Sequence, residues 1–175
     1  MKNLLRGLVL AGLTVACVHA QQEKKGEGVY WPAFIALNDS ESVDIVGLRF
    51  NIVEGYCENM TGLDLGFIGR NRYFNGLQLN LLRNAVEDDL AGWQIGFYNS
   101  AGQGEAAGLQ TGLWNESQVF YGIEAGLVNI VDYCNGLQVG VINRAEDHRG
   151  LQVGLINVIR NSRVPFFPGI NIGIY

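Results

Sequence analysis

Short blocks in which apolar and polar residues alternate recur along most of the chain, and each block opens with a glycine. If that glycine is position 0, position 1 is large and apolar, position 2 is polar, and positions 3 and 5 are mostly apolar. A period of two predicts a half-buried strand with positions 1, 3 and 5 in the core and position 2 facing outward. Nine such units repeat at intervals of 14 to 19 residues, opening at Gly47, Gly62, Gly76, Gly92, Gly108, Gly122, Gly136, Gly150 and Gly169.

Positions 4 and 6 interrupt this alternation. Position 4 is always Gly or Asn, and position 6 is always apolar or aromatic. Because Gly and Asn tolerate positive φ, a bend at position 4 would turn both positions 5 and 6 toward a core. Alternatively, position 4 is small because another group packs over it. The sequence is compatible with both interpretations.

Position 7 indicates how the units are assembled. It is Asn in five consecutive units, and identical Asn side chains stacked in parallel hydrogen-bond to one another as a ladder. Each unit has Gly at one end and Asn at the other. Near-identical copies of such a unit favour a solenoid, because parallel coils give every copy the same surroundings. The five residues are Asn99, Asn115, Asn129, Asn143 and Asn157.

We therefore predict an all-β protein, a narrow β-solenoid of about nine coils of 14–16 residues with apolar end caps. The alternative is an antiparallel β-meander or a small outer-membrane β-barrel. Strands of such barrels need about 9–11 residues with a lipid-facing band, which is longer than the apolar block of this unit.

The ends of the chain predict export and a single folded domain. Residues 1–20 are expected to be a signal peptide cut before Gln21, and lipidation at Cys17 is the alternative. Residues 21–29 are expected to be a linker, and residues 30–175 one repeat domain. Within that domain we expect an N-terminal cap at 30–46, repeats at 47–161, and a C-terminal cap with the last strand at 162–175.

The repeated Gly-Leu-Gln-x-Gly-x-x-Asn blocks resemble those of a bacterial surface repeat-containing protein family, over about residues 30–175. The opening blocks at Gly47 and Gly62 and the Pro-Phe-Phe-Pro stretch near the end are similar too. The resemblance implies an exported protein at the cell surface or associated with the outer membrane, and it implies no catalytic residues. Asn51 and Asn80 at position 4 depart from the pattern, and the first three units lack Asn at position 7. Those units are expected to stack less regularly.

The residues that carry chemistry are few and scattered. A net charge of −5 argues against a nucleic-acid partner. His148 is expected in a solvated turn, and Cys57 and Cys134 are expected too far apart to pair. The acidic groups Glu87-Asp88-Asp89 and Glu146-Asp147 are also expected in solvated turns. We therefore predict no enzyme activity, no cofactor and no metal site.

Position 2 supplies the one candidate binding surface. If position 2 faces outward, its side chains form a strip along the sheet. This strip would either bind an extended polymer such as a glycan or only keep the face soluble. We expect an exported, non-catalytic scaffold in the bacterial cell envelope, with a glycan or another envelope protein as partner and with membrane association left open. The alternatives are a small integral outer-membrane β-barrel and a glycan-binding solenoid. The strip consists of Gln78, Gln94, Gln110, Glu124, Gln138 and Gln152.

Overall fold

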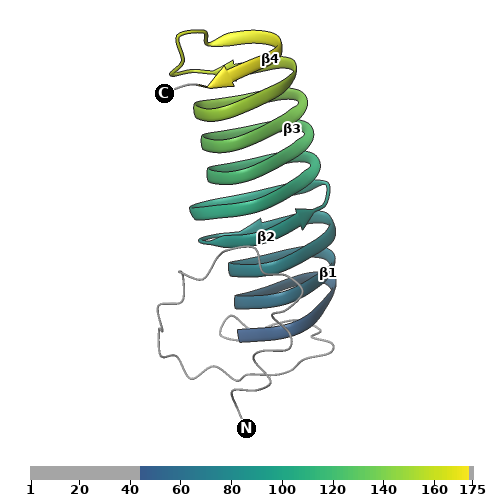
Figure 1. Ribbon diagram of the computed structural model, residues 1–175. Helices are drawn as coiled ribbons and strands as arrows, with labels where there is room; N and C mark the ends of the chain where they lie inside the picture. Colours follow the sequence, from purple (N-terminus) through teal and green to yellow (C-terminus); the bar gives the residue numbers. More distant parts are fainter. Residues whose placement is uncertain (1–43, 174–175) are drawn as a thin grey trace.

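A computed structural model describes residues 44–173 of the chain. β1 (Asp44–Val86), β2 (Leu90–Ile95), β3 (Tyr98–Ile159) and β4 (Phe166–Gly173) form one open sheet in the order β1-β2-β3-β4. The described residues contain no helix, so the predicted all-β class is confirmed. The chain winds in turns stacked along one axis, from β1 at one end to β4 at the other (Figure 1). The strands are long because the backbone stays extended from one turn into the next.

Several predicted segments lie outside the described residues. These are the signal peptide at 1–20, the linker at 21–29, residues 30–43 of the predicted N-terminal cap, and residues 174–175.

Successive units lie directly over one another in parallel register. Gly76 pairs with Gly92 and Gly92 with Gly108, so the Gln residues two positions later are also in line. β1, β2 and β3 pair only in parallel, and the antiparallel meander is therefore wrong for these strands. We call each stacked turn a layer, and layers 1 to 8 open at Gly47, Gly62, Gly76, Gly92, Gly108, Gly122, Gly136 and Gly150.

The predicted facing of the strands is wrong. Position 2 is buried in all eight layers, whereas positions 1, 3, 5 and 6 are half-buried or exposed. Apolar side chains usually face the core, but here the polar side chains at position 2 do so. They form hydrogen bonds with one another inside the stack, so their burial leaves few polar atoms unpaired. Positions 5 and 6 do share one side, as a bend requires, but that side is the outer one.

Position 0 holds the backbone conformation that requires glycine in every layer, whereas among the position-4 glycines of layers 1 to 8 Gly66 alone has it. The opening glycines of all eight layers have φ between 132° and 156°. A side chain at Gly108 would overlap the carbonyl oxygen of Gly92 in the layer before it. Position 4 is small for the other predicted reason, because the main-chain carbonyl of position 4 in the preceding layer and an Asn amide both pack over it. A Cβ at Gly112 would lie 2.6 Å from Nδ2 of Asn99.

The final unit runs backwards. β4 pairs antiparallel with the end of β3, with Gly169 opposite Gly154 and Gly173 opposite Gly150. A ninth parallel copy, as predicted, is therefore wrong. The sequence Gly-Ile-Asn-Ile-Gly is symmetrical about its centre, so the reversed strand still places Asn171 opposite Gln152. The reversal occurs through the turn at residues 160–165, and β4 covers the edge of layer 8.

Candidate functional site

The predicted binding strip is a column inside the stack. All six of its side chains are completely buried, so an extended polymer cannot reach them, and the strip is wrong as a binding surface. The amides instead hydrogen-bond from layer to layer. Nε2 of Gln94 donates to Oε1 of Gln78 at 2.9 Å, and Nε2 of Gln110 donates to Oε1 of Gln94 at 2.7 Å. In the later layers, Gln152 donates to Gln138 at 2.7 Å.

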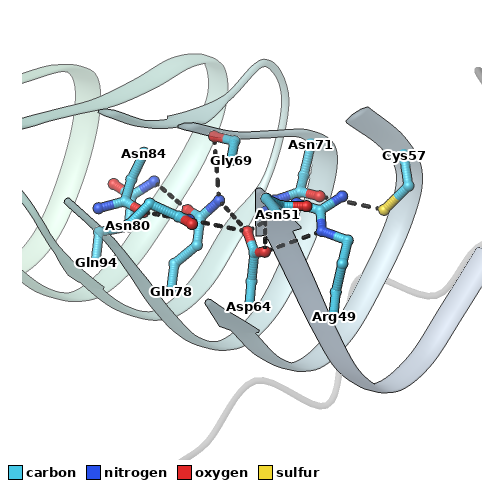
Figure 2. A network of polar contacts seen from close by, with 10 residues as sticks. All are labelled: Arg49, Asn51, Cys57, Asp64, Gly69, Asn71, Gln78, Asn80, Asn84 and Gln94. Carbon is cyan, nitrogen blue, oxygen red and sulfur yellow. Dashed lines mark hydrogen bonds and ion pairs between the residues drawn. The ribbon is translucent and has the colours of Figure 1, made fainter. Parts of the chain in front are cut away.

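The column ends at a buried ion pair that the sequence prediction missed (Figure 2). Arg49 and Asp64 occupy position 2 of layers 1 and 2, and both side chains are fully buried. The Arg49 guanidinium donates through Nε to Oδ1 of Asp64 at 2.9 Å and through Nη2 to Oδ2 at 2.7 Å. The Asp64 carboxylate also accepts from Asn51, Gln78 and Asn80, at 2.6, 2.9 and 3.2 Å. The sequence did contain a signal for this ion pair, because position 2 carries opposite charges in these two adjacent units.

Glu124 replaces the amide at position 2 of layer 6. Its Oε2 accepts from Nε2 of Gln138 at 2.7 Å, and the Ser117 hydroxyl, which also contacts Glu124, donates to Oε1 of Gln110 at 3.0 Å. No hydrogen bond joins Glu124 to Gln110, so the column is interrupted between layers 5 and 6. Burial raises the pKa of Glu124 to about 8, and the contacts with Gln138 and Ser117 offset only part of this.

Glu124 should make the fold less stable as the pH rises. Because its pKa is about 8 in the fold and 4.5 as a free side chain, the unfolded chain releases this proton first. The free energy of unfolding should therefore fall by up to about 5 kcal/mol between the two pKa values. Glu124→Gln, which restores the amide found in neighbouring layers, should remove this loss. Chemical denaturation of both proteins at several pH values measures it, and an unchanged pH profile in the variant would contradict the assignment.

Position 7 supplies a second internal column, and this prediction is confirmed. Each Asn donates through Nδ2 to Oδ1 of the next, from Asn99 through Asn115, Asn129 and Asn143 to Asn157, at 2.7–2.8 Å. Each also donates to a main-chain carbonyl, as Asn115 does to Ala125 at 3.1 Å. Asn84 extends the column by donating to Asn99 at 2.7 Å. Leu79 pairs with Ile95 but Arg83 pairs with Tyr98, so layer 3 has one residue more than layer 4 in between. This extra residue places Asn84 one position late, which hid it in the sequence.

Two apolar columns complete the interior of the stack. One lies nine positions after each opening glycine in most layers and holds small side chains such as Ala101, Ser117 and Val131. The other lies two positions before the next glycine. Its members are Met60, Phe74, Leu90, Ala106, Phe120, Cys134 and His148, and all are 2% exposed or less.

Burial removes the reactive side chains from solvent. Cys57 and Cys134 are both buried and are not joined by a disulfide, which confirms that they do not pair. Burial is the main cause that raises the pKa of the Cys134 thiol, so it stays protonated. The prediction that His148 lies in a solvated turn is wrong, because its side chain is completely buried. Burial lowers the pKa of His148 to about 4, partly offset by a contact with the main chain of Leu151.

His148 should destabilise the fold as the pH falls. Its pKa is 6.5 as a free side chain and about 4 in the fold, so the unfolded chain binds the proton first on acidification. The free energy of unfolding should drop by up to about 3 kcal/mol across that interval. His148→Leu, which introduces the residue found at Leu90 of the same column, should lack this acid-side loss. Denaturation at matched pH values tests it, and an equal loss in both proteins would show that His148 is not responsible.

Most of the exposed charged residues lie outside positions 1 to 6 of the layers. Arg70 bridges Glu54 and Glu87 at 3.3 Å, and Arg72 contacts Asp88 at 2.8 Å. These partly exposed pairs link neighbouring layers and add little stability each. The acidic turns predicted as solvated are thus partly paired with arginine. Among residues 44–173, no group of three or more His, Cys, Asp or Glu side chains is placed to hold a metal ion.

One side of the stack is an apolar face, which we define as positions 1, 3, 5 and 6 of layers 1 to 8. At positions 1, 3 and 5 no charged side chain of the described residues points outward, and Arg49, Asp64 and Glu124 at position 2 are buried. Next to position 6 of layer 3, Arg83 is exposed and pairs in register with Tyr98, and its guanidinium lies 5.4 Å from the centre of the Tyr98 ring. Large side chains on this face are widely exposed, with Trp93 at 49%, Phe97 at 52% and Leu155 at 71%. The sequence prediction missed this face because it placed the same residues in the core.

Comparisons with family models, curated proteins and solved structures find no match for the chain. Residues 44–173 contain no helix that is long and apolar enough to cross a membrane.

Proposed function

We propose that the protein is an exported, non-catalytic scaffold of the bacterial cell envelope that associates with a partner through its apolar face. The observation that carries this proposal is the face itself, which runs over eight layers with no outward charge at positions 1, 3 and 5. Exposed apolar patches larger than a few hundred Å² on soluble proteins mark interaction sites. The signal-peptide pattern of residues 1–20 supports export.

The interior supports a scaffold role rather than catalysis. The thiols of Cys57 and Cys134 and the imidazole of His148, which are the usual nucleophile and base types, are enclosed in the apolar columns. The polar groups at positions 2 and 7 are committed to hydrogen bonds between layers. Each layer therefore uses its polar chemistry to hold the next one, and its outward surface is left for association.

The test is expression of the full chain in a Gram-negative bacterium, followed by fractionation and native mass measurement. We expect the chain outside the cytoplasm, in a form larger than a single chain or bound to the envelope. Replacing Leu81, Leu113 and Leu155 by Lys should abolish this association without preventing export, because three charges then lie on the apolar face. The matched control places Lys at Gln103, Gln118 and Asn135, which are exposed and lie outside positions 1 to 6. Retention in the cytoplasm, or equal association of both variants, would overturn the proposal.

A further inference from the structure

The apolar face is not uniform along the stack. Layer 4 carries the bulkiest set, with Trp93, Ile95 and Phe97 at positions 1, 3 and 5. Layer 6, two layers further on, has Ile123, Ala125 and Leu127 at the same positions. A raised layer and a shallow layer thus lie on either side of layer 5, which is the middle of the nine strands stacked from layer 1 to β4.

We propose that the apolar face pairs with the same face of a second copy of this chain, in a two-fold dimer whose axis runs parallel to the strands at layer 5. The proposal rests on the proposed function and names its partner. The two stacks then run in opposite directions, and layer 4 of one copy lies on layer 6 of the other. Trp93 and Phe97 of each copy pack where the partner presents Ile123, Ala125 and Leu127.

The area of the face matches what a stable dimer needs. Eight layers spaced about 4.8 Å apart span about 38 Å, and six strand residues span about 20 Å. The resulting area of about 750 Å² is close to the ~800 Å² that each partner contributes to a typical stable interface. A free monomer would leave this apolar area in water.

Charge and spacing also favour a second copy. Positions 1, 3 and 5 carry no outward charge and Arg83 lies at the position-6 edge, so two such faces meet without burying an unpaired ion at their centre. Both faces carry layers at the same spacing, so each layer of one copy meets a layer of the other along the whole length. A two-fold contact uses the same patch on both copies and closes on itself.

The opposite orientation of the two stacks is preferred over the same orientation. With the stacks running the same way, layer 4 would face layer 4 and layer 6 would face layer 6. Bulky Trp93 and Phe97 would then crowd against their own copies, and Ala125 would face Ala125 across a gap. Both crowding and voids are unfavourable in packed interfaces.

The first part of the test is the mass of the purified full chain in detergent-free buffer, by sedimentation equilibrium. We expect the mass of two chains, and the mass of one chain for the variant with Lys at Leu81, Leu113 and Leu155. The control with Lys at Gln103, Gln118 and Asn135 should remain a dimer. A single chain that binds phosphatidylcholine vesicles, a single chain that does not, or an open-ended polymer would overturn the dimer. A face-dependent association with vesicles would leave the proposed function standing.

The second part tests the register with a short bismaleimide cross-linker suited to sheets packed about 10 Å apart. Thr111→Cys lies in layer 5 on the predicted axis and should give a covalent dimer. Leu155→Cys in layer 8 should not link to itself, but the double variant with Phe67→Cys in layer 2 should link between copies. The unmodified chain controls for Cys57 and Cys134, which are buried. Cross-linking of Leu155→Cys alone, or none at Thr111→Cys, would overturn the arrangement.

Discussion

Gly108→Ala should destabilise the fold by about 3 kcal/mol or more, because two unfavourable effects coincide at this position. Gly108 has φ of +138°, a conformation that residues with a side chain rarely adopt. The added methyl would also overlap the carbonyl oxygen of Gly92, which is fixed in the stack by the in-register pairing of the two layers. Since that oxygen belongs to the main chain, neither layer is free to move away alone. Urea denaturation followed by circular dichroism measures the loss.

Gly169→Ala is the matched control for this prediction. Gly169 also has positive φ, at +90°, but no atom lies within 4 Å of the position that its Cβ would take. This variant should therefore lose only the strain part, of the order of 1 kcal/mol. An equal loss in both variants would show that the close approach of the layers contributes nothing.

Asp64→Leu should destabilise the fold by about 3–5 kcal/mol, because it leaves Arg49 buried without its opposite charge. The carboxylate also accepts hydrogen bonds from Asn51, Gln78 and Asn80, so three buried amides lose an acceptor as well. Thermal and chemical denaturation of the variant measure the effect. A loss below about 1 kcal/mol, the range of exposed pairs, would contradict the buried geometry.

The double variant Arg49→Gln with Asp64→Gln distinguishes the effect of the buried charges from the effect of the hydrogen-bonded column at position 2. Gln at both positions would continue the pattern in which each Nε2 donates to the Oε1 of the preceding layer. We expect the double variant to recover most of the stability lost in Asp64→Leu. Arg49→Gln alone should be less stable than the double variant, because Asp64 then remains as an unpaired buried carboxylate. Equal stability of the single and double variants would count against a coupled pair.

The repeat itself was predictable from the sequence, because identical residues recur at nearly constant spacing. Parallel in-register stacking followed from the different ends of the unit, and the Asn column followed from the stacking. The exception at Asn84 arose because layer 3 has one residue more than layer 4 between Leu79 and Arg83, which displaces the amide by one position.

The facing of the strands could not be predicted from alternation, because alternation defines two faces without saying which one is inside. Gln78 and its equivalents are polar, and an isolated strand with buried Gln would leave the amides unpaired. Stacking changes this balance, since each Gln amide finds a partner in the neighbouring layer. Burial of His148 and the reversal of β4 depended on the three-dimensional path of the chain, which local composition does not contain.

The most direct test of the buried amide columns is the solvent exchange of side-chain amide protons, measured by nuclear magnetic resonance on the folded chain. Gln103 and Gln118 are exposed and serve as internal references. We predict that the amide protons of Gln94, Gln110 and Asn129 exchange at least about a hundredfold more slowly than the references, since they are released only when the stack opens. Exchange of Gln94 and Gln110 as fast as that of Gln103 and Gln118 would place position 2 on the outside and contradict the account.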